Sequence, residues 1–252
     1  MSGILQARSS EADGAPARAA GNNAAAPRFV FMLTHDDLTV ANARQLVPAI
    51  SAAGVRHAGA KDLGLPAEEL VALFADLRAA GCTTFLEVVS ETPEAMVASA
   101  KAALTIRPDY LVGGTEIAAT LAILEGSGIG FMPYVGRIVG HPCLLRGAVD
   151  EIVADAHRAE TAGVDGINLL AYRYDGDVEA LVAAVLGAVS IPVLCAGSVD
   201  SEARVETMRR LGVWGFTVGT AALDGLFVPG GDLTAQLRRV LEVASGPSGG
   251  PS

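Results

Sequence analysis

Cysteine is scarce in this chain of 252 residues, and the scarcity limits the classes of protein to which the chain can belong. Its three cysteines, Cys82, Cys143 and Cys195, lie far apart in the sequence. An odd number of widely separated thiols provides neither a disulfide framework nor the paired spacing of a zinc site. The sequence therefore favours a reducing compartment, the cytoplasm, and predicts no metal site.

Positive charge and long apolar runs are also lacking. Lys and Arg number 18 against 28 Asp and Glu, which gives a formal net charge of −10. A chain with this excess and no Lys/Arg cluster is a poor match for nucleic-acid phosphates. No segment offers the roughly 20 consecutive apolar residues of a membrane span. We therefore expect neither a nucleic acid nor a membrane as a partner, whereas a homo-oligomer is compatible with the sequence.

The two ends of the chain lack hydrophobic periodicity. Residues 1–27 are rich in Ala, Gly, Ser and Asn, and they contain no uninterrupted apolar segment like that of a signal peptide. Residues 245–252 read SGPSGGPS. Such compositions cannot bury enough apolar surface to fold. We expect a flexible extension over 1–27, a single domain over 28–244 and a flexible tail over 245–252.

The region between these ends repeats one pattern, in which a short apolar run is followed by a turn and an amphipathic segment. Several runs are apolar on both faces, as in strands that are covered on both sides. Intervening segments such as 40–54, 67–81 and 201–212 have helical spacing and end in glycine. The eight apolar runs are 28–34, 55–61, 83–89, 109–115, 130–136, 166–172, 191–197 and 215–221.

Eight strand–helix units in succession predict an α/β fold of the (β/α)8 type, a TIM barrel. A doubly wound sheet is the alternative, but such sheets usually have fewer strands and a different glycine pattern. In a (β/α)8 barrel the active site lies at the carboxyl ends of the strands. Polar residues that end an apolar run are therefore the candidates for a site.

Lys61 and Glu87 are the strongest catalytic candidates. Lys61 ends the second run, and Glu87 interrupts the otherwise apolar third run, TTFLEVV. A buried carboxylate is costly without a partner, so we expect the two side chains to converge. Glu87 is then an acid/base group, and Lys61 either forms a Schiff base with a carbonyl substrate or polarises it. An inert structural ion pair is the alternative interpretation.

The turns after the seventh and eighth runs predict a phosphate site. Each turn combines glycine with a small or hydroxyl residue and then opens a helix. Small residues let backbone N–H groups approach a ligand, and a helix N-terminus favours an anion. Tight turns without a ligand are the alternative. The predicted phosphate-binding residues are Gly197, Ser198, Gly219 and Thr220.

The remaining candidates come from other strand ends and from the long connection 134–147. We expect Asn168 and Tyr172, in the sixth run, to complete the catalytic set by orienting hydroxyl groups. Arginines in a long loop suit bidentate binding of an anionic substrate. The predicted substrate-binding residues are Arg137, His141, Thr115 and Arg146.

Several motifs across residues 28–244 resemble a little-characterised bacterial group of phosphate-binding barrels, some of them labelled 4-hydroxythreonine-4-phosphate dehydrogenase. The motifs are KDLGLP, LEVVS, YLVGGT, GRIVGHP, NLLAYRYDGD, AGSVDS and GFTVGTAALDG. The established dehydrogenase of that name has another type of fold and metal-binding histidines, which this sequence does not show. A lysine that ends strand two, with a carboxylate on another strand, is also similar to sugar-phosphate epimerases, decarboxylases and Schiff-base aldolases of this superfold.

Together these features predict a lyase, aldolase or isomerase that acts on a small phosphorylated carbonyl or sugar-like metabolite without a cofactor. Two alternatives stay open. One is a flavin- or NAD-dependent oxidoreductase, although GSGIG at 126–130 precedes a strand and so lacks the setting of a dinucleotide fingerprint. The other is a non-catalytic barrel that binds a phosphorylated ligand.

Overall fold

The computed structural model describes residues 22, 26–90, 92–140 and 142–246. His141, residues 247–252 of the predicted tail and most of the predicted extension lie outside the described residues.

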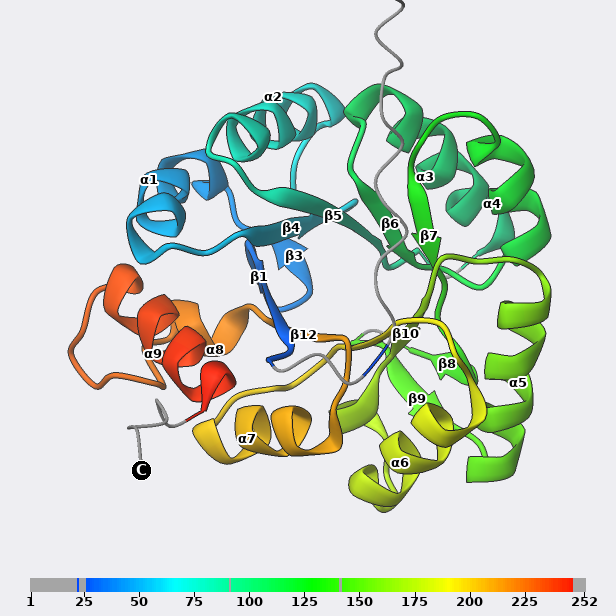
Figure 1. Cartoon of the computed structure of the whole chain (residues 1–252). Helices are drawn as coiled ribbons and strands as arrows, with labels where there is room; N and C mark the ends of the chain where they lie inside the picture. The colour runs from blue at the N-terminus through cyan, green and yellow to red at the C-terminus, as the bar shows by residue number, and fades with distance from the viewer. Residues whose placement is uncertain (1–21, 23–25, 91, 141, 247–252) are drawn as a thin grey trace, which may run out of the picture.

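Eight parallel strands form a nearly closed barrel surrounded by helices (Figure 1). Their order in the sheet is β10-β11-β12-β1-β4-β5-β6-β7. Each strand lies within one of the eight predicted runs, so the (β/α)8 prediction is confirmed. The strands are β1 (Arg28–Met32), β4 (His57–Lys61), β5 (Thr83–Val88), β6 (Tyr110–Gly113), β7 (Gly130–Met132), β10 (Ile167–Leu169), β11 (Val193–Cys195) and β12 (Gly215–Val218).

The helices begin and end at recognisable local signals. Gly54 and Gly212 adopt the left-handed conformation just after α1 and α7, which stops each helix. Asp232 caps α9 by accepting a hydrogen bond from the Ala235 N–H. The helices are α1 (Ala43–Ala53), α2 (Ala67–Ala79), α3 (Pro93–Ile106), α4 (Ile117–Leu124), α5 (Val149–Thr161), α6 (Val178–Ala188), α7 (Glu202–Leu211), α8 (Thr220–Leu223), α9 (Leu233–Ser245) and the 3-10 turn η1 (Ala171–Arg173).

The barrel is completed between β7 and β10, the two ends of the strand order. Tyr134 and Asn168 form an isolated parallel bridge there. The Asn168 N–H donates to the Pro133 carbonyl at 2.7 Å. These contacts bring the segments at the ends of strands five and six of the barrel to the same rim.

Side chains alternate between the outside and the inside of the barrel. On β1, Phe29 and Phe31 face the helices, whereas Val30 and Met32 join the inner cluster. The inner cluster fills the barrel with Val30, Met32, Phe85, Tyr110, Val112, Met132, Leu194 and Trp214. Because these apolar side chains occupy the interior, the polar inward-facing residues near the strands' carboxyl ends lie at the mouth of a packed barrel.

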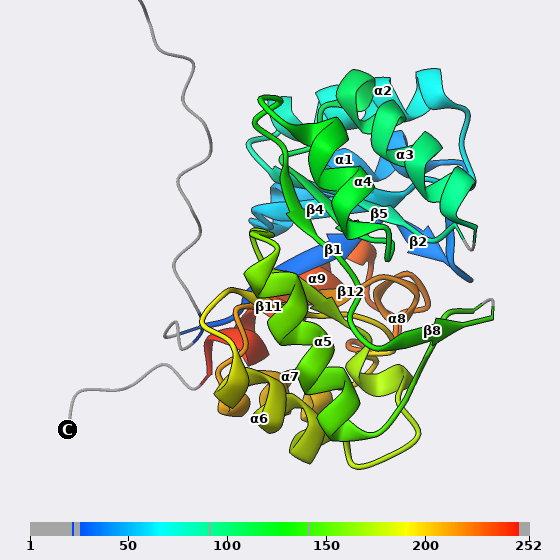
Figure 2. The same ribbon diagram turned by 90° about the vertical axis from the view of Figure 1, so that its right-hand side faces the viewer.

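Two antiparallel hairpins come directly after strands one and five of the barrel, and neither was predicted. The first pairs β2 (Thr34–His35) with β3 (Leu38–Thr39), and the second pairs β8 (Arg137–Val139) with β9 (Leu144–Arg146). The connection 134–147 is thus partly a hairpin, and Figure 2 shows β8 reaching outward from the barrel mouth. Two-residue hairpin turns need positive φ, which Asp36 and Asp37 adopt at 48° and 62°.

Asn22, within the predicted extension, contacts the opposite end of the barrel. Its side-chain amide donates to the Ile191 carbonyl at 2.9 Å and accepts from the Val193 N–H at 3.0 Å. The chain is therefore attached to β11 before β1 begins. Among the described residues, no helix has the length and apolar character needed to cross a membrane.

Candidate active site

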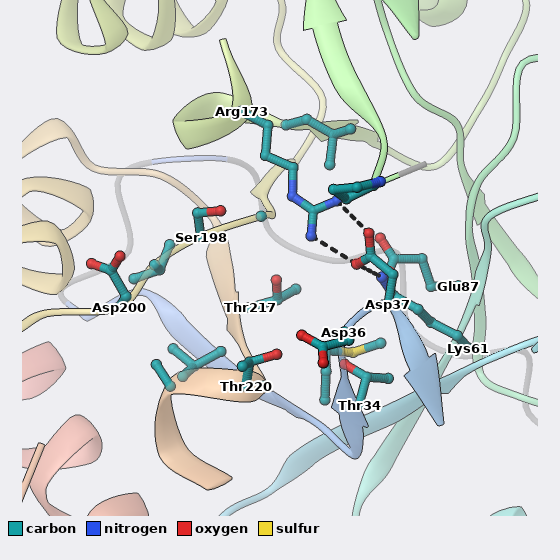
Figure 3. A pocket seen from close by; sticks show the side chains of 18 of the residues that line it. Thr34, Asp36, Asp37, Lys61, Glu87, Arg173, Ser198, Asp200, Thr217 and Thr220 are labelled. Carbon is teal, nitrogen blue, oxygen red and sulfur yellow. Dashed lines mark hydrogen bonds and ion pairs between the residues drawn. The ribbon is translucent and has the colours of Figure 1, made fainter. Parts of the chain in front are cut away.

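A cavity of about 580 Å³ opens at the carboxyl ends of the strands (Figure 3). Its lining comes from the carboxyl ends of β1, β4, β5, β11 and β12 with the segments after them, from η1, from Leu170 after β10 and from Pro142 between β8 and β9. It brings together the two strongest catalytic candidates and all four predicted phosphate ligands. These are Lys61, Glu87, Gly197, Ser198, Gly219 and Thr220.

Strand register places Lys61 beside Glu87. The two residues pair directly between the parallel strands β4 and β5, so their side chains leave the sheet on the same face. Each residue is only 5% exposed, and Lys61 Nζ lies 3.5 Å from Glu87 Oε2. The other Glu87 oxygen, Oε1, accepts a hydrogen bond from the Tyr134 hydroxyl at 2.8 Å. Burial, assisted by the charge of Glu87, raises the pKa of Tyr134 well above its usual value, which keeps this hydroxyl a donor.

Asp37 is the nearer partner of Lys61. Its Oδ1 lies 2.5 Å from Lys61 Nζ. Arg173 binds the same carboxylate with two hydrogen bonds, of 2.8 Å from Nη1 and 2.7 Å from Nη2. Burial opposes ionisation of Asp37, but the hydrogen bonds and charges of Arg173 and Lys61 outweigh it and hold the pKa of this carboxyl well below its usual value.

The β2–β3 hairpin holds Asp37 in this position. The Thr39 hydroxyl accepts from the Lys61 N–H and donates to the Lys61 carbonyl, both at 2.9 Å, and so joins the hairpin to the end of β4. Two carboxylates and two cations thus meet below the mouth of the barrel; we name Asp37, Lys61, Glu87 and Arg173 the ionic cluster. Leaving one member of a buried ion pair unpaired costs about 3–5 kcal/mol, so its members fix one another's positions.

The two turns at the other end of the cavity require glycine. At Gly197, where φ is +79°, a Cβ atom would lie 2.9 Å from the Cγ and Cδ atoms of Arg173. At Gly219 a Cβ would lie 2.8 Å from Thr34 Oγ1. Ser198 also has a positive φ, 54°, a strained conformation for a residue with a side chain.

A helix follows each of these turns, directly at α8 and after a short segment at α7, so their chemistry suits an anion. Thr220 opens α8, and Ser198 precedes α7 by four residues. The first N–H groups of a helix lack intrahelical acceptors. Asp200 also lines the cavity, and its carboxylate pairs with Arg204 at 2.7 Å, which offsets its negative charge near the turns.

Two predicted catalytic residues do not line the cavity. Asn168 is 1% exposed on β10, and neither its side-chain nitrogen nor its oxygen has a hydrogen-bond partner among the described residues. The Tyr172 ring lies instead under the Arg204 guanidinium, 4.5 Å from its central carbon. Their proposed roles in orienting hydroxyl groups stay predictions.

The three predicted substrate-binding residues that the structure describes, Thr115, Arg137 and Arg146, are also outside the cavity lining. Thr115 is exposed, and its hydroxyl lies 3.5 Å from Met96 Sδ. Arg137 and Arg146 stand opposite each other on the β8–β9 hairpin, and Arg146 is 3.4 Å from Asp175. His141 lies outside the described residues. The structure brings none of the three described residues to Lys61.

Sequence reasoning missed Asp37 and Arg173. Both come just after apolar runs and so belong to the polar strand ends, but no residue pattern distinguishes them from solvated loop residues. Asp37 comes inward through a hairpin turn without glycine or asparagine, and Arg173 through a three-residue 3-10 turn. Among the residues that the structure describes, no three His, Cys, Asp or Glu side chains gather as a metal site would need.

No family model and no curated protein sequence matches the chain. Solved structures do resemble it. The orotidine 5'-phosphate decarboxylase from Pyrococcus horikoshii OT3 has a TM-score of 0.62 at 11% identity, over 86% of this chain and 99% of that one. The BexX/CysO complex of Amycolatopsis orientalis gives 0.60 at 17% identity, over 90% and 94%.

The N-acetylmannosamine-6-phosphate 2-epimerase from Clostridium perfringens gives a TM-score of 0.58 at 13% identity, over 77% of this chain and 86% of that one. At such identities the likeness is one of fold. The resemblance to the bacterial group with the dehydrogenase label stays a prediction. The chain shares the (β/α)8 barrel fold of these proteins.

Proposed function

We propose that the chain is an enzyme, a lyase, aldolase or isomerase, that acts on a small phosphorylated carbonyl compound. The observation that carries this proposal is that one cavity contains both the ionic cluster and the two glycine turns. A phosphate bound at the turns would leave the rest of the substrate directed toward Lys61 and Glu87. Barrels of the same fold include a decarboxylase and an epimerase whose names specify phosphorylated compounds, which supports this substrate class.

Lys61 acts in this proposal as a charged hydrogen-bond donor. An ammonium group has three donors, and the Asp37 and Glu87 carboxylates face two of them. The third is free for a substrate carbonyl oxygen, where a fixed positive charge would stabilise the negative charge that develops as an enolate forms. This role fits the geometry better than an imine, because imine formation would require Nζ to leave an Asp37 oxygen only 2.5 Å away.

Glu87 moves the proton. Its Oε2 faces Lys61 and its Oε1 accepts a hydrogen bond from Tyr134, which fixes the carboxylate near the ammonium group. A carbonyl bound to Lys61 would bring its neighbouring carbon close to Glu87. It takes a proton from that carbon while the C–H electron pair moves into the enolate. Return of the proton to a different carbon or face gives an isomerase. In an aldolase, Glu87 takes the proton of the hydroxyl group one carbon beyond the bond that breaks, the C–C electron pair moves into the same enolate as an aldehyde leaves, and Glu87 then returns the proton to the enolate carbon.

Asp37 and Arg173 position the reacting groups. Asp37 holds Nζ, and the bidentate Arg173 holds Asp37, so neither needs to touch the reacting atoms. A fixed Nζ reduces the reorganisation required when charge develops.

Exchange of substrate protons with solvent tests this function without knowledge of the net reaction. The protein is incubated in D2O with dihydroxyacetone phosphate, D-ribulose 5-phosphate or D-fructose 6-phosphate, and loss of the proton next to the carbonyl is followed by proton NMR. We expect exchange with at least one of these compounds, and a loss of at least about 100-fold in Glu87→Gln, the usual scale of a general base.

The matched control is Glu94→Gln, which alters an exposed glutamate in the first turn of α3. It should exchange at the wild-type rate. Absence of exchange with the whole panel, or full exchange in Glu87→Gln, would overturn the proposal. Borohydride added with the active compound separates the two roles of Lys61, since only an imine leaves the substrate's mass on that residue.

A further inference from the structure

Two threonine side chains line the cavity, and their hydroxyls make no hydrogen bond to other described residues. Thr34 is 6% exposed and Thr217 is 9% exposed, and both line the cavity. Two other buried threonines of the barrel are bonded in both directions. The Thr84 hydroxyl donates to Asp109 Oδ2 at 2.8 Å and accepts from the Asp109 N–H at 3.0 Å. Thr39 similarly bonds Lys61 at its N–H and carbonyl.

The two hydroxyl-bearing side chains lie between the glycine turns and the ionic cluster. Thr34 Oγ1 adjoins Gly219, since a Cβ built on that glycine would be 2.8 Å away. Thr217 precedes Gly219 by two residues on β12 and faces the same cavity. In Figure 3, Thr217 falls between Ser198 on one side and the Asp37–Lys61 pair on the other. A ligand that extends from the turns to Lys61 would therefore pass these hydroxyls.

A hydroxyl group is the ligand chemistry that suits this stretch. A ligand that displaces water from these hydroxyls has to replace the hydrogen bonds that water makes, and an apolar ligand would leave the hydroxyls without a partner. A ligand hydroxyl both donates and accepts, as a threonine hydroxyl does, and therefore pairs with either orientation of it.

We propose that the substrate carries free hydroxyl groups on the carbons between its phosphate and its carbonyl, and that Thr34 and Thr217 bind them. The substrate class is thus a sugar phosphate, not a deoxy or aliphatic phosphate. This proposal rests on the proposed function, because it assumes a phosphate at the glycine turns. Thr34 and Thr217 are specificity residues in it, and they take no part in proton transfer.

Binding of two matched probes tests the proposal. Ribitol 5-phosphate and n-pentyl phosphate have five carbons and the same charge, and they differ in their hydroxyl groups. Neither has a carbonyl, so calorimetry measures binding without turnover. Valine has the shape of threonine without its hydroxyl, so Thr34→Val, Thr217→Val and the double variant remove the proposed contacts. Thr105→Val, at an exposed position on α3, is the control.

We expect each cavity variant to weaken ribitol 5-phosphate binding by about 3- to 10-fold, the value of one hydrogen bond, and the double variant by about the product. Binding of n-pentyl phosphate should be unchanged or tighter. The melting temperature of the unliganded variants should be equal to that of the wild type, since the lost hydroxyls bond no described protein group.

The outcomes separate the two proposals. If both probes bind to the wild type, and the valine variants weaken neither or both equally, the sugar-phosphate assignment is overturned and the phosphate site stands. A marked fall in the unliganded melting temperature would show that the hydroxyls serve the fold, and would also overturn it. If neither probe nor inorganic phosphate binds, the proposed function fails, and this assignment fails with it.

Discussion

At the scale of single residues, the candidate site depends on a carboxylate that holds two cations. Asp37 is buried between Lys61 and Arg173, whereas most ion pairs of this chain lie at the surface. Asp76 provides the comparison, because it binds Arg44 at the same short range, 2.7 Å, with both side chains substantially exposed. Exposed pairs contribute about 0–1 kcal/mol, but breaking a buried pair leaves an uncompensated charge.

We therefore expect Asp37→Asn to lower the free energy of unfolding at pH 7 by about 3 kcal/mol and Asp76→Asn by less than about 1 kcal/mol. Urea unfolding followed by circular dichroism measures both values. Equal losses in the two variants would show that the ionic cluster is no more strongly coupled than a surface pair.

The ionisation of Asp37 also predicts the direction in which the stability of the protein changes with pH. The pKa of Asp37 is lower in the folded protein than its ordinary value of 3.8. The folded state therefore binds fewer protons at this site than the unfolded state in that range. The resulting stability is fully present above about pH 4 and is lost as the pH falls toward the folded-state pKa. In the same urea series, taken from pH 5 to pH 3, Asp37→Asn should lose less stability than the wild type.

At the scale of elements, apolar patterning predicted the barrel strands but not the hairpins after them. Each run of β-branched and aromatic residues became a strand because it is covered on both faces, and glycine at 54 and 212 ended helices as expected. The β2–β3 hairpin has strands of two residues, too short for any alternation to be visible. Its turn residues, both aspartates, also lack the Asn-Gly signature of such turns.

Part of the candidate site could also be predicted from the sequence, and part could not. Lys61 and Glu87 could be chosen because charged residues in apolar runs are costly, and strand register then made them neighbours. The direction of the Tyr172 side chain depends on a 3-10 turn, and the inward position of Asp37 depends on a hairpin. The geometry of both elements arises from contacts between residues that are distant in sequence. Hydrophobic periodicity carries no information about such turns.

The turn after β11 illustrates how an element controls the site. Gly197 has a φ of +79° and lies against the side chain of Arg173, so alanine there adds both backbone strain and a clash. Gly163 has a similar φ of +87° with nothing within 4 Å of a built Cβ, and so alanine there adds the strain alone. The pair of substitutions isolates the effect of displacing Arg173.

We expect Gly163→Ala to cost about 1 kcal/mol, as is usual for a left-handed glycine, and Gly197→Ala to cost about 1–3 kcal/mol more. Gly197→Ala should also slow the deuterium exchange proposed above, because Asp37 would lose its bidentate partner. Thermal unfolding and proton NMR give the two measurements. If the two alanine variants had the same stability and the same exchange rate, Arg173 would have shifted without losing its hydrogen bonds to Asp37.

At the scale of the whole molecule, the barrel is attached to a segment that precedes its first strand. Asn22 uses both groups of its amide on β11, donating to the Ile191 carbonyl and accepting from the Val193 N–H. A side-chain amide thereby satisfies two backbone groups at the strand's amino end, on the face of the barrel that serves stability and not catalysis. The composition of residues 1–27 gave no sign of this contact, because an asparagine in an Ala- and Gly-rich stretch has no periodic context.

Two truncations test how much this contact contributes. Removing residues 1–21 should leave the melting temperature unchanged, since that stretch lacks the apolar content to build a core. Removing residues 1–27 deletes two hydrogen bonds, each worth about 0.5–1.5 kcal/mol, and should lower the free energy of unfolding by about 1–3 kcal/mol.

Asn22→Ala in the full chain should reproduce most of that loss, whereas Asn42→Ala, at an exposed position before α1, should not. Because the contact lies at the end of the barrel opposite the cavity, deuterium exchange should be equal in all these variants at about 25 °C. If the two truncated proteins had equal melting temperatures, the contact made by Asn22 would contribute nothing measurable to the stability of the barrel.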